Sequence, residues 1–87
     1  MSVHVEFFGI PRQRAGVVET TAAGARLGDV LADLAGRFPQ LAEACLDGQQ
    51  LQAGYVANVN GQAFVTDPAT PLLPGDSLLI LSADAGG

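Results

Sequence analysis

Apolar and polar residues alternate with period two over residues 3–8, which predicts a half-buried strand at the start of the chain. One face of this strand carries Val3, Val5 and Phe7. The other face carries His4, Glu6 and Phe8. The first face is entirely apolar, so we expect it to pack against the core and the second to meet solvent at least in part.

Residues 27–38 show the period of an amphipathic helix. Apolar side chains recur there at helical spacing: Leu27, Val30, Leu31, Leu34, Ala35 and Phe38. Asp29 in the first turn and Arg37 in the last both favour the helix dipole. We expect Pro39 to end this helix and residues 40–46 to form a short second one, with Cys45 facing inward.

Glycine, proline and asparagine mark the connections between the remaining elements. Residues 9–14 are predicted to be a loop, because Gly9 and Pro11 interrupt the alternation, and residues 15–21 a second strand that pairs with the first. Residues 55–60 form a third strand pattern. The following Asn60-Gly61 predicts a tight type I′ turn into a short strand over 62–65.

The last strand pattern, over residues 77–81, follows a predicted type II turn at Pro74-Gly75. The order of elements is strand, strand, helix, strand, short strand, strand. Two strand pairs separated by one main helix predict a mixed sheet covered on one face, with the last strand parallel to the first. This is an α+β fold of the β-grasp type. We assign residues 1–81 to the domain and residues 82–87 to an extended tail.

The last strand is apolar at four consecutive positions, from Leu78 to Leu81. Because side chains alternate along a strand and the helix covers one face, one pair of these residues must point to the open face. Contiguous exposed apolar groups often mark interaction sites, and Phe8 would enlarge this patch. We therefore favour a partner surface. The alternatives are that loops cover this face or that a single surface leucine has no special role.

Composition narrows the range of partners. The 87 residues carry nine acidic side chains against four arginines and no lysine, for a formal charge of -5. This balance argues against nucleic acid, which binds to basic surfaces, and is compatible with basic protein partners. No apolar run is long enough for a membrane span, and the first residues do not resemble a signal peptide. We expect a cytoplasmic protein.

Few side chains in the sequence suggest chemistry of their own. A single cysteine cannot form an internal disulfide, and a single histidine, His4, gives no expected cluster of metal ligands. Cys45 is more typical of a small core residue than of a catalytic thiol. Asp84, near the end of the chain, is either a contact to a basic channel or an ordinary solubilising charge.

The sequence ends in Gly86-Gly87 after a run of small or polar residues. Glycine has no Cβ, so such an end can enter a channel too narrow for other side chains and present its carboxylate there. The alternative is a frayed terminus.

Several motifs, taken together and in this order, resemble the ubiquitin-related β-grasp sulfur carriers. They are Val5-x-Phe7-Phe8-Gly9, the arginine-bearing loop leading to Gly16, the helix over 27–38, Asn58-Val59-Asn60-Gly61, Pro74-Gly75-Asp76 and Gly86-Gly87. Within that family the chain is most similar to the small subunit of molybdopterin synthase. It is related to the thiamin-pathway carriers, which are usually shorter through the middle.

The resemblance implies a carrier without an active site of its own. An ATP-dependent activating enzyme would adenylate the Gly87 carboxylate, and a sulfur donor would convert it to a thiocarboxylate, while Gly86 provides clearance. Leu79 and Leu81 would contact the partner, with Phe8 and Asp84 beside them, and Leu78 and Ile80 would lie in the core. The implied partners are the activating enzyme and the larger catalytic subunit of molybdopterin synthase. No bound cofactor or metal is implied, because the partner uses the ATP.

Three functions remain open from the sequence. The first is sulfur transfer to a precursor of molybdopterin, or alternatively to the thiamin or cysteine pathway. The second is a protein modifier whose activated terminus is joined to lysines of other proteins. The third is a binding module in which the terminal glycines have no role.

Overall fold

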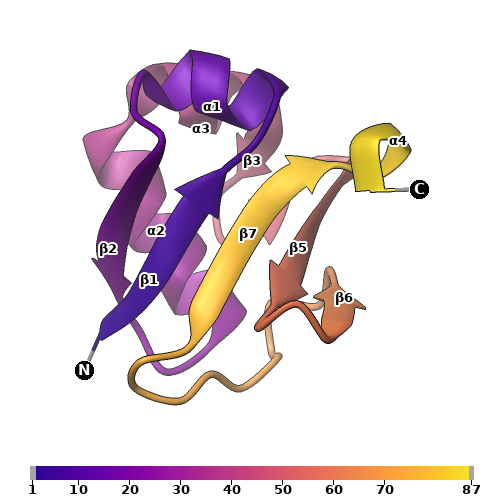
Figure 1. Cartoon of the computed structure of the whole chain (residues 1–87). Helices are drawn as coiled ribbons and strands as arrows, with labels where there is room; N and C mark the ends of the chain where they lie inside the picture. The colour runs from indigo at the N-terminus through magenta and orange to yellow at the C-terminus, as the bar shows by residue number, and fades with distance from the viewer. Residues whose placement is uncertain (1, 87) are drawn as a thin grey trace.

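Five strands form a mixed sheet in the order β2-β1-β7-β5-β6 in the computed structural model, which describes residues 2–86 (Figure 1). The strands are β1 (Ser2–Phe7), β2 (Glu19–Ala23), β5 (Tyr55–Val59), β6 (Ala63–Val65) and β7 (Ser77–Ser82). The first and last strands, β1 and β7, run parallel at the centre, and the other neighbours in the sheet are antiparallel. This arrangement confirms the predicted α+β fold of the β-grasp type.

The helices, apart from the short last one, cover one face of this sheet. The helices are α1 (Ile10–Ala15), α2 (Leu27–Arg37), α3 (Pro39–Cys45) and α4 (Ala83–Gly86), and a separate pair of short strands consists of β3 (Leu46–Asp47) and β4 (Gln50–Leu51). In Figure 1, α2 lies behind the sheet, and the face turned to the viewer carries no helix. Within residues 2–86, no helix is long and apolar enough to cross a membrane.

The core lies between α2 and the sheet and contains the residues that the two periodicities predicted. Val3, Val5 and Phe7 of β1 are buried, whereas His4 and Glu6 between them reach solvent. The buried residues of the helix layer include Leu27, Val30, Leu31, Leu34, Leu41 and Cys45. Phe38 packs edge-on against Phe7 with ring centroids 6.0 Å apart, which joins the end of α2 to the central strand.

The predicted loop over residues 9–14 was wrong, because Ile10–Ala15 forms the helix α1. Pro11 lies in the first turn, where its missing N–H costs no hydrogen bond. Gly16, in the left-handed conformation with φ of 78°, ends the helix and donates its N–H to the Arg12 carbonyl. The glycines and the proline therefore mark the ends of a helix rather than an irregular loop.

This helix also displaces the second strand. We predicted it over residues 15–21, but β2 runs from Glu19 to Ala23, because Ala15 is still helical. Similarly, Pro39 ends α2 as predicted, but it also occupies the first turn of α3, so the short second helix begins one residue earlier than expected.

Both predicted tight turns are present. Asn60 and Gly61 have φ of 55° and 69°, and the Gln62 N–H donates to the Val59 carbonyl at 3.0 Å. Positive φ at both central positions is the signature of the predicted type I′ turn. Before β7, Gly75 has φ of 84° and the Asp76 N–H donates to the Leu73 carbonyl at 3.0 Å, as a type II turn requires.

Asp76 ties these two turns together. Its carboxylate accepts hydrogen bonds from the Leu73 N–H at 2.8 Å and from the Asn60 side-chain amide at 3.0 Å. The Asn60 side-chain carbonyl in turn accepts the Ser77 N–H at 2.8 Å. Chiefly the Leu73 bond, and then the Asn60 bond, hold the pKa of Asp76 below its usual value. The start of β7 is thus fixed to the hairpin of β5 and β6.

We predict that Asp76→Asn lowers the thermal unfolding midpoint at neutral pH, because an amide replaces a carboxylate that accepts two hydrogen bonds. A folded-state pKa below the unfolded one contributes stability that is complete above the ordinary aspartate value of 3.8. That contribution is lost as the pH falls through the lowered folded-state value. The difference in midpoint between wild type and variant should therefore shrink below about pH 4.

The control is Asp47→Asn, which removes the charge of an exposed aspartate in β3. Its side chain makes no hydrogen bond or ion pair among the described residues. Calorimetric midpoints across the acid range check the comparison. An Asp76→Asn midpoint equal to that of the control at neutral pH would contradict the assigned role.

Candidate docking face and C-terminal tail

The last strand divides its apolar side chains between the two faces of the sheet. Leu78 and Ile80 are buried in the core under the helices, as predicted. Leu79 and Leu81 therefore point to the open face, because side chains alternate along a strand. Their exposure differs: Leu79 is half-buried, but Leu81 is only 5% exposed. Both residues thus lie on the predicted outer face, but Leu81 offers little free surface there.

The position of Leu81 accounts for this difference. Its cross-strand partner is Val56, itself half-buried, and the short helix α4 packs against β5 and β7 at the same end of the sheet. Figure 1 shows α4 directly after the end of β7. Leu81 therefore lies where the chain turns back on the domain, whereas Leu79 lies one row further from the tail.

Two exposed phenylalanines extend the apolar surface around Leu79. Phe8 is 50% exposed, and its N–H donates to the Ile80 carbonyl at 3.0 Å, which fixes it beside β7. Phe64 is 57% exposed on β6, in a row with Leu79, because both residues pair with Asn58 of β5. We call the surface formed by Phe8, Phe64 and Leu79 the docking face.

Phe64 was not among the residues predicted from the sequence. Its signal was the alternation of residues 62–65, which places Phe64 opposite to Ala63 and Val65. That alternation shows which side chains share a face, but only the order of strands shows that Phe64 lies on the face of Leu79.

A shallow hollow of about 200 Å³ adjoins the docking face. Its lining combines apolar and polar side chains from three strands and the β5–β6 turn: Glu6, Asn58, Gly61, Ser77, Leu78 and Leu79. The hollow lies beside the turn that Asp76 and Asn60 hold in place. It gives the apolar surface a shape into which a partner side chain can project.

The tail differs from the extended segment that we predicted. β7 continues through Ser82, and Ala83–Gly86 forms one helical turn. The Ala83 N–H donates to the Gly54 carbonyl at 2.8 Å, and the Ala85 N–H donates to the Ser82 hydroxyl at 3.3 Å. Alanine favours helix and a serine hydroxyl satisfies a free N–H at a helix start, which explains the turn.

The predicted residues of the tail are only partly described. Asp84 is exposed in the turn, so its carboxylate is accessible to a partner. Gly86 is the last residue of α4, and Gly87, the predicted reacting residue, lies outside the described residues.

Cys45 is a core residue, as predicted. Its side chain is fully buried, and this burial raises the pKa of the thiol, although hydrogen bonding with Tyr55 opposes the shift. A raised pKa disfavours the thiolate, which is the nucleophilic form. Burial and the raised pKa therefore argue against a nucleophilic role for Cys45.

The fold and this surface define a class of protein, the ubiquitin-like β-grasp proteins with an open sheet face beside the C-terminus. The ThiS family model matches residues 5–87, which is nearly the whole chain. The chain therefore belongs to the ThiS family. No curated protein sequence matches it.

Three of the similar solved structures carry different names. The small archaeal modifier protein 1 of Methanosarcina acetivorans is 26% identical, with a TM-score of 0.77, covering 99% of this chain and 96% of that one. A putative molybdopterin converting factor, subunit 1, of Pyrococcus furiosus is also 26% identical, with a TM-score of 0.75, covering 94% and 97%.

The third structure contains a protein partner. It is the BexX/CysO complex of Amycolatopsis orientalis, 26% identical to this chain with a TM-score of 0.78, covering 98% of this chain and 99% of the matched one. Together these findings support a ubiquitin-like sulfur carrier or modifier that works with a protein partner. They do not select one acceptor.

We predict that Leu79→Gln weakens binding to a protein partner, for which the activating enzyme implied by the resemblance is the candidate, because a polar amide replaces an apolar group of similar size on the docking face. Burying an unpaired amide costs about 1–3 kcal/mol, which corresponds to roughly tenfold or more in affinity. Titration calorimetry with the activating enzyme of the same organism measures the change.

The matched control is Leu73→Gln, because Leu73 is 69% exposed in the loop before β7 and is not part of the docking face. The Leu73→Gln variant should bind the enzyme with wild-type affinity. If Leu79→Gln also binds with wild-type affinity, and circular dichroism shows an intact fold, then partners bind elsewhere.

Proposed function

We propose that the chain is a sulfur carrier whose C-terminal glycine, Gly87, is adenylated by an activating enzyme and then converted to a thiocarboxylate. The supporting observation is that the ThiS family match continues through Gly86 and Gly87. The docking face provides the second support, because it presents apolar side chains next to the strand that leads to this end.

The proposed chemistry activates a group that is otherwise unreactive. A C-terminal carboxylate is ionised at neutral pH, and its negative charge resists attack by a nucleophile. Its oxygen would attack the α-phosphorus of ATP, with pyrophosphate as the leaving group. Hydrosulfide would then attack the carbonyl carbon of the adenylate and expel AMP, which leaves the thiocarboxylate. The partner would provide the charge stabilisation and exclude water.

The tail conformation bears on how this carboxylate reaches a partner. Four residues of helix span about 6 Å, whereas the same four residues extended span roughly 13 Å. In the proposed reaction α4 opens, the Ala83 bond to Gly54 breaks, and the tail extends into the partner. Leu81 is then free to join the docking face, which reconciles its burial here with its predicted role.

For the acceptor, we propose a precursor of molybdopterin, reached through a complex with the larger catalytic subunit of molybdopterin synthase. The resemblance of the sequence motifs to the small subunit supports this choice, and the Pyrococcus furiosus structure carries a molybdopterin name. The similarity to CysO keeps another sulfur acceptor as the alternative.

A second candidate function is protein modification. The similarity to small archaeal modifier protein 1 favours it, because the same activated terminus can be transferred to an amine. Its product would be an amide between Gly87 and a lysine of another protein. The chain contains no lysine, so copies of it could not be joined through an internal lysine. Gly-Gly remnants on cellular proteins would indicate modification, and their absence together with thiocarboxylate formation would indicate a carrier.

We predict that deletion of Gly87 abolishes the first step, measured as ATP–pyrophosphate exchange by the activating enzyme. Deletion leaves a carboxylate one residue short, and misplacing a reacting group by about 1 Å can already cost about 10²-fold. The variant should still bind the enzyme, because Phe8, Phe64 and Leu79 are unchanged.

The control is Asp84→Asn, which alters the tail but leaves Gly86 and Gly87 in place. Exchange with this control should remain well above that of the deletion variant. Wild-type exchange rates after deletion of Gly87 would contradict the proposed reacting group.

A further inference from the structure

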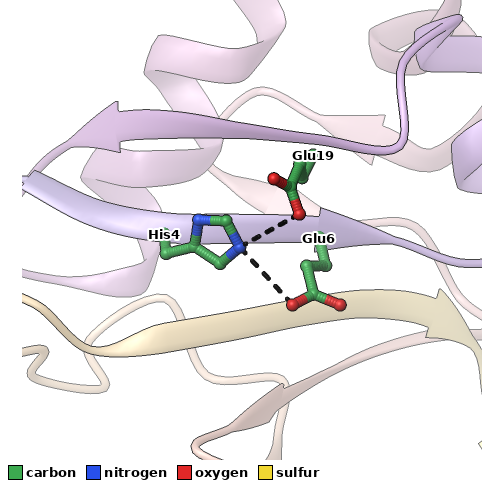
Figure 2. Close-up of side chains that lie close together, drawn as sticks. All are labelled: His4, Glu6 and Glu19. Carbon is green, nitrogen blue, oxygen red and sulfur yellow. Dashed lines mark ion pairs between the residues drawn. The ribbon is translucent and has the colours of Figure 1, made fainter.

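Three side chains converge on the open face of the sheet. They lie over β1 and the edge strand β2, away from the end of β7 that carries the tail. Figure 2 shows His4 and Glu6 of β1 beside Glu19 of β2, with the His4 imidazole directed at both carboxylates. The His4 Nε2 atom lies 3.4 Å from a Glu6 oxygen and 3.5 Å from a Glu19 oxygen. One ligand atom from each residue lies within 4.8 Å of the other two.

The strand pairing holds these positions. His4 and Glu6 are two residues apart on β1 and share a face, and Glu6 is directly opposite Glu19 in the antiparallel pair. The three groups are therefore positioned by backbone hydrogen bonds of the sheet rather than by a mobile loop. Such support reduces the cost of bringing ligands together around an ion.

The pairing of β1 with β2 also places two negative charges side by side, which costs folding free energy. Like charges directly opposite each other on neighbouring strands are destabilising, and Glu6 and Glu19 form such a pair. Within residues 2–86, the His4 imidazole is the only basic group at ion-pair distance from either carboxylate. The two carboxylates thus share one imidazole, and a bound cation would offset the repulsion between them.

A hydrogen bond does not account well for the spacing. N–H···O bonds have donor–acceptor distances of about 2.7–3.2 Å, and one Nε2–H cannot point at two carboxylates at once. Metal ligation does fit. Zinc binds imidazole nitrogen and carboxylate oxygen at about 2.0–2.2 Å, so two ligand atoms of a tetrahedral site lie roughly 3.3–3.6 Å apart. Both N–O separations fall in this range, and the three ligand atoms all lie within 4.8 Å of one another.

We propose that His4, Glu6 and Glu19 bind Zn²⁺ as a three-ligand surface site. The ion neutralises the two carboxylates, and water completes the tetrahedron in the free protein. We expected no cluster of metal ligands from a single histidine, because that expectation did not count glutamates; strand pairing brings two of them beside His4, as a group that could hold an ion.

The site borders the docking face. Glu6 pairs with Leu79 in the parallel register and lines the same hollow. A bound ion would replace two negative charges beside the docking face with a neutral centre that has one exchangeable ligand position. The site rests on the sheet alone and is independent of the proposed sulfur chemistry.

Zinc titration of the full chain tests this proposal. His4 is the only histidine, so NMR of the imidazole C–H signals reports on one residue without ambiguity. We expect saturable shifts at one equivalent and a matching stoichiometry by calorimetry. Mutating a residue that only hydrogen-bonds to a metal ligand already costs about 10- to 100-fold in metal affinity. His4→Ala and Glu19→Gln, which change ligands themselves, should therefore each weaken zinc binding at least about tenfold. Glu43→Gln, an exposed glutamate on α3, is the matched control and should bind zinc as wild type does.

Thermal unfolding separates a metal site from a simple ion pair. Without zinc, Glu19→Gln should unfold at or above the wild-type temperature, because the variant removes the like-charge pair. With zinc, the wild-type midpoint should rise and that of Glu19→Gln should not. The proposal is overturned by non-saturable binding to wild type, by unchanged affinity in His4→Ala, or by an equal zinc-induced rise in Glu19→Gln.

Discussion

The parallel pairing of β1 with β7 is the constraint on which the rest of the structure depends. It joins the two ends of the chain at the centre of the sheet, with Val5 beside Leu78 and Phe7 beside Ile80. Those four side chains are buried, so the pairing builds the core and fixes the register of the last strand together. A shift of one residue would reverse the faces of β7 and place Leu79 in the core.

The register of β7 decides which of its side chains lie on the open face, because the helices cover only the other face. Because α2 packs on one face only (Figure 1), the other face of the central strands is open to solvent at His4, Glu6 and Leu79, although Leu81 there is nearly covered. The docking face lies over β7 and its neighbours, and the tail follows the end of β7. The group of His4, Glu6 and Glu19 lies over β1 and β2. The Asp76 network supports this arrangement, since it fixes where β7 begins relative to the β5–β6 hairpin.

The sequence predicted what depends on local periodicity and turn chemistry. The alternation of β1, the stripe of α2 and the Asn60-Gly61 turn were confirmed because each depends on neighbours within a few residues. Gly9 and Pro11 were misinterpreted, since the same residues that interrupt a strand also begin a helix. Alanine propensity and the Ser82 hydroxyl favour the turn of Ala83–Gly86 locally, but the bond that holds it against the domain, from the Ala83 N–H to the Gly54 carbonyl, could not be predicted from the sequence.

The candidate site, too, could be predicted only where it depends on local patterns in the sequence. The directions of Leu78, Leu79 and Ile80 followed from alternation, but the burial of Leu81 depends on the turn that follows it. Strand order and register bring Phe64 to the docking face and Glu19 beside His4 and Glu6. No local pattern in a single sequence encodes that order or register. The family resemblance is the source of the proposed role of Gly87, and the structure adds the exposed apolar surface on and beside β7.

The most direct test of the central claim is the intact mass of the protein after incubation with ATP, a sulfide source and the activating enzyme of the same organism. The account predicts a gain equal to the difference between one sulfur and one oxygen atom, located in the C-terminal peptide that contains Gly87. An unchanged mass, with an enzyme that loads another carrier under the same conditions, would contradict it.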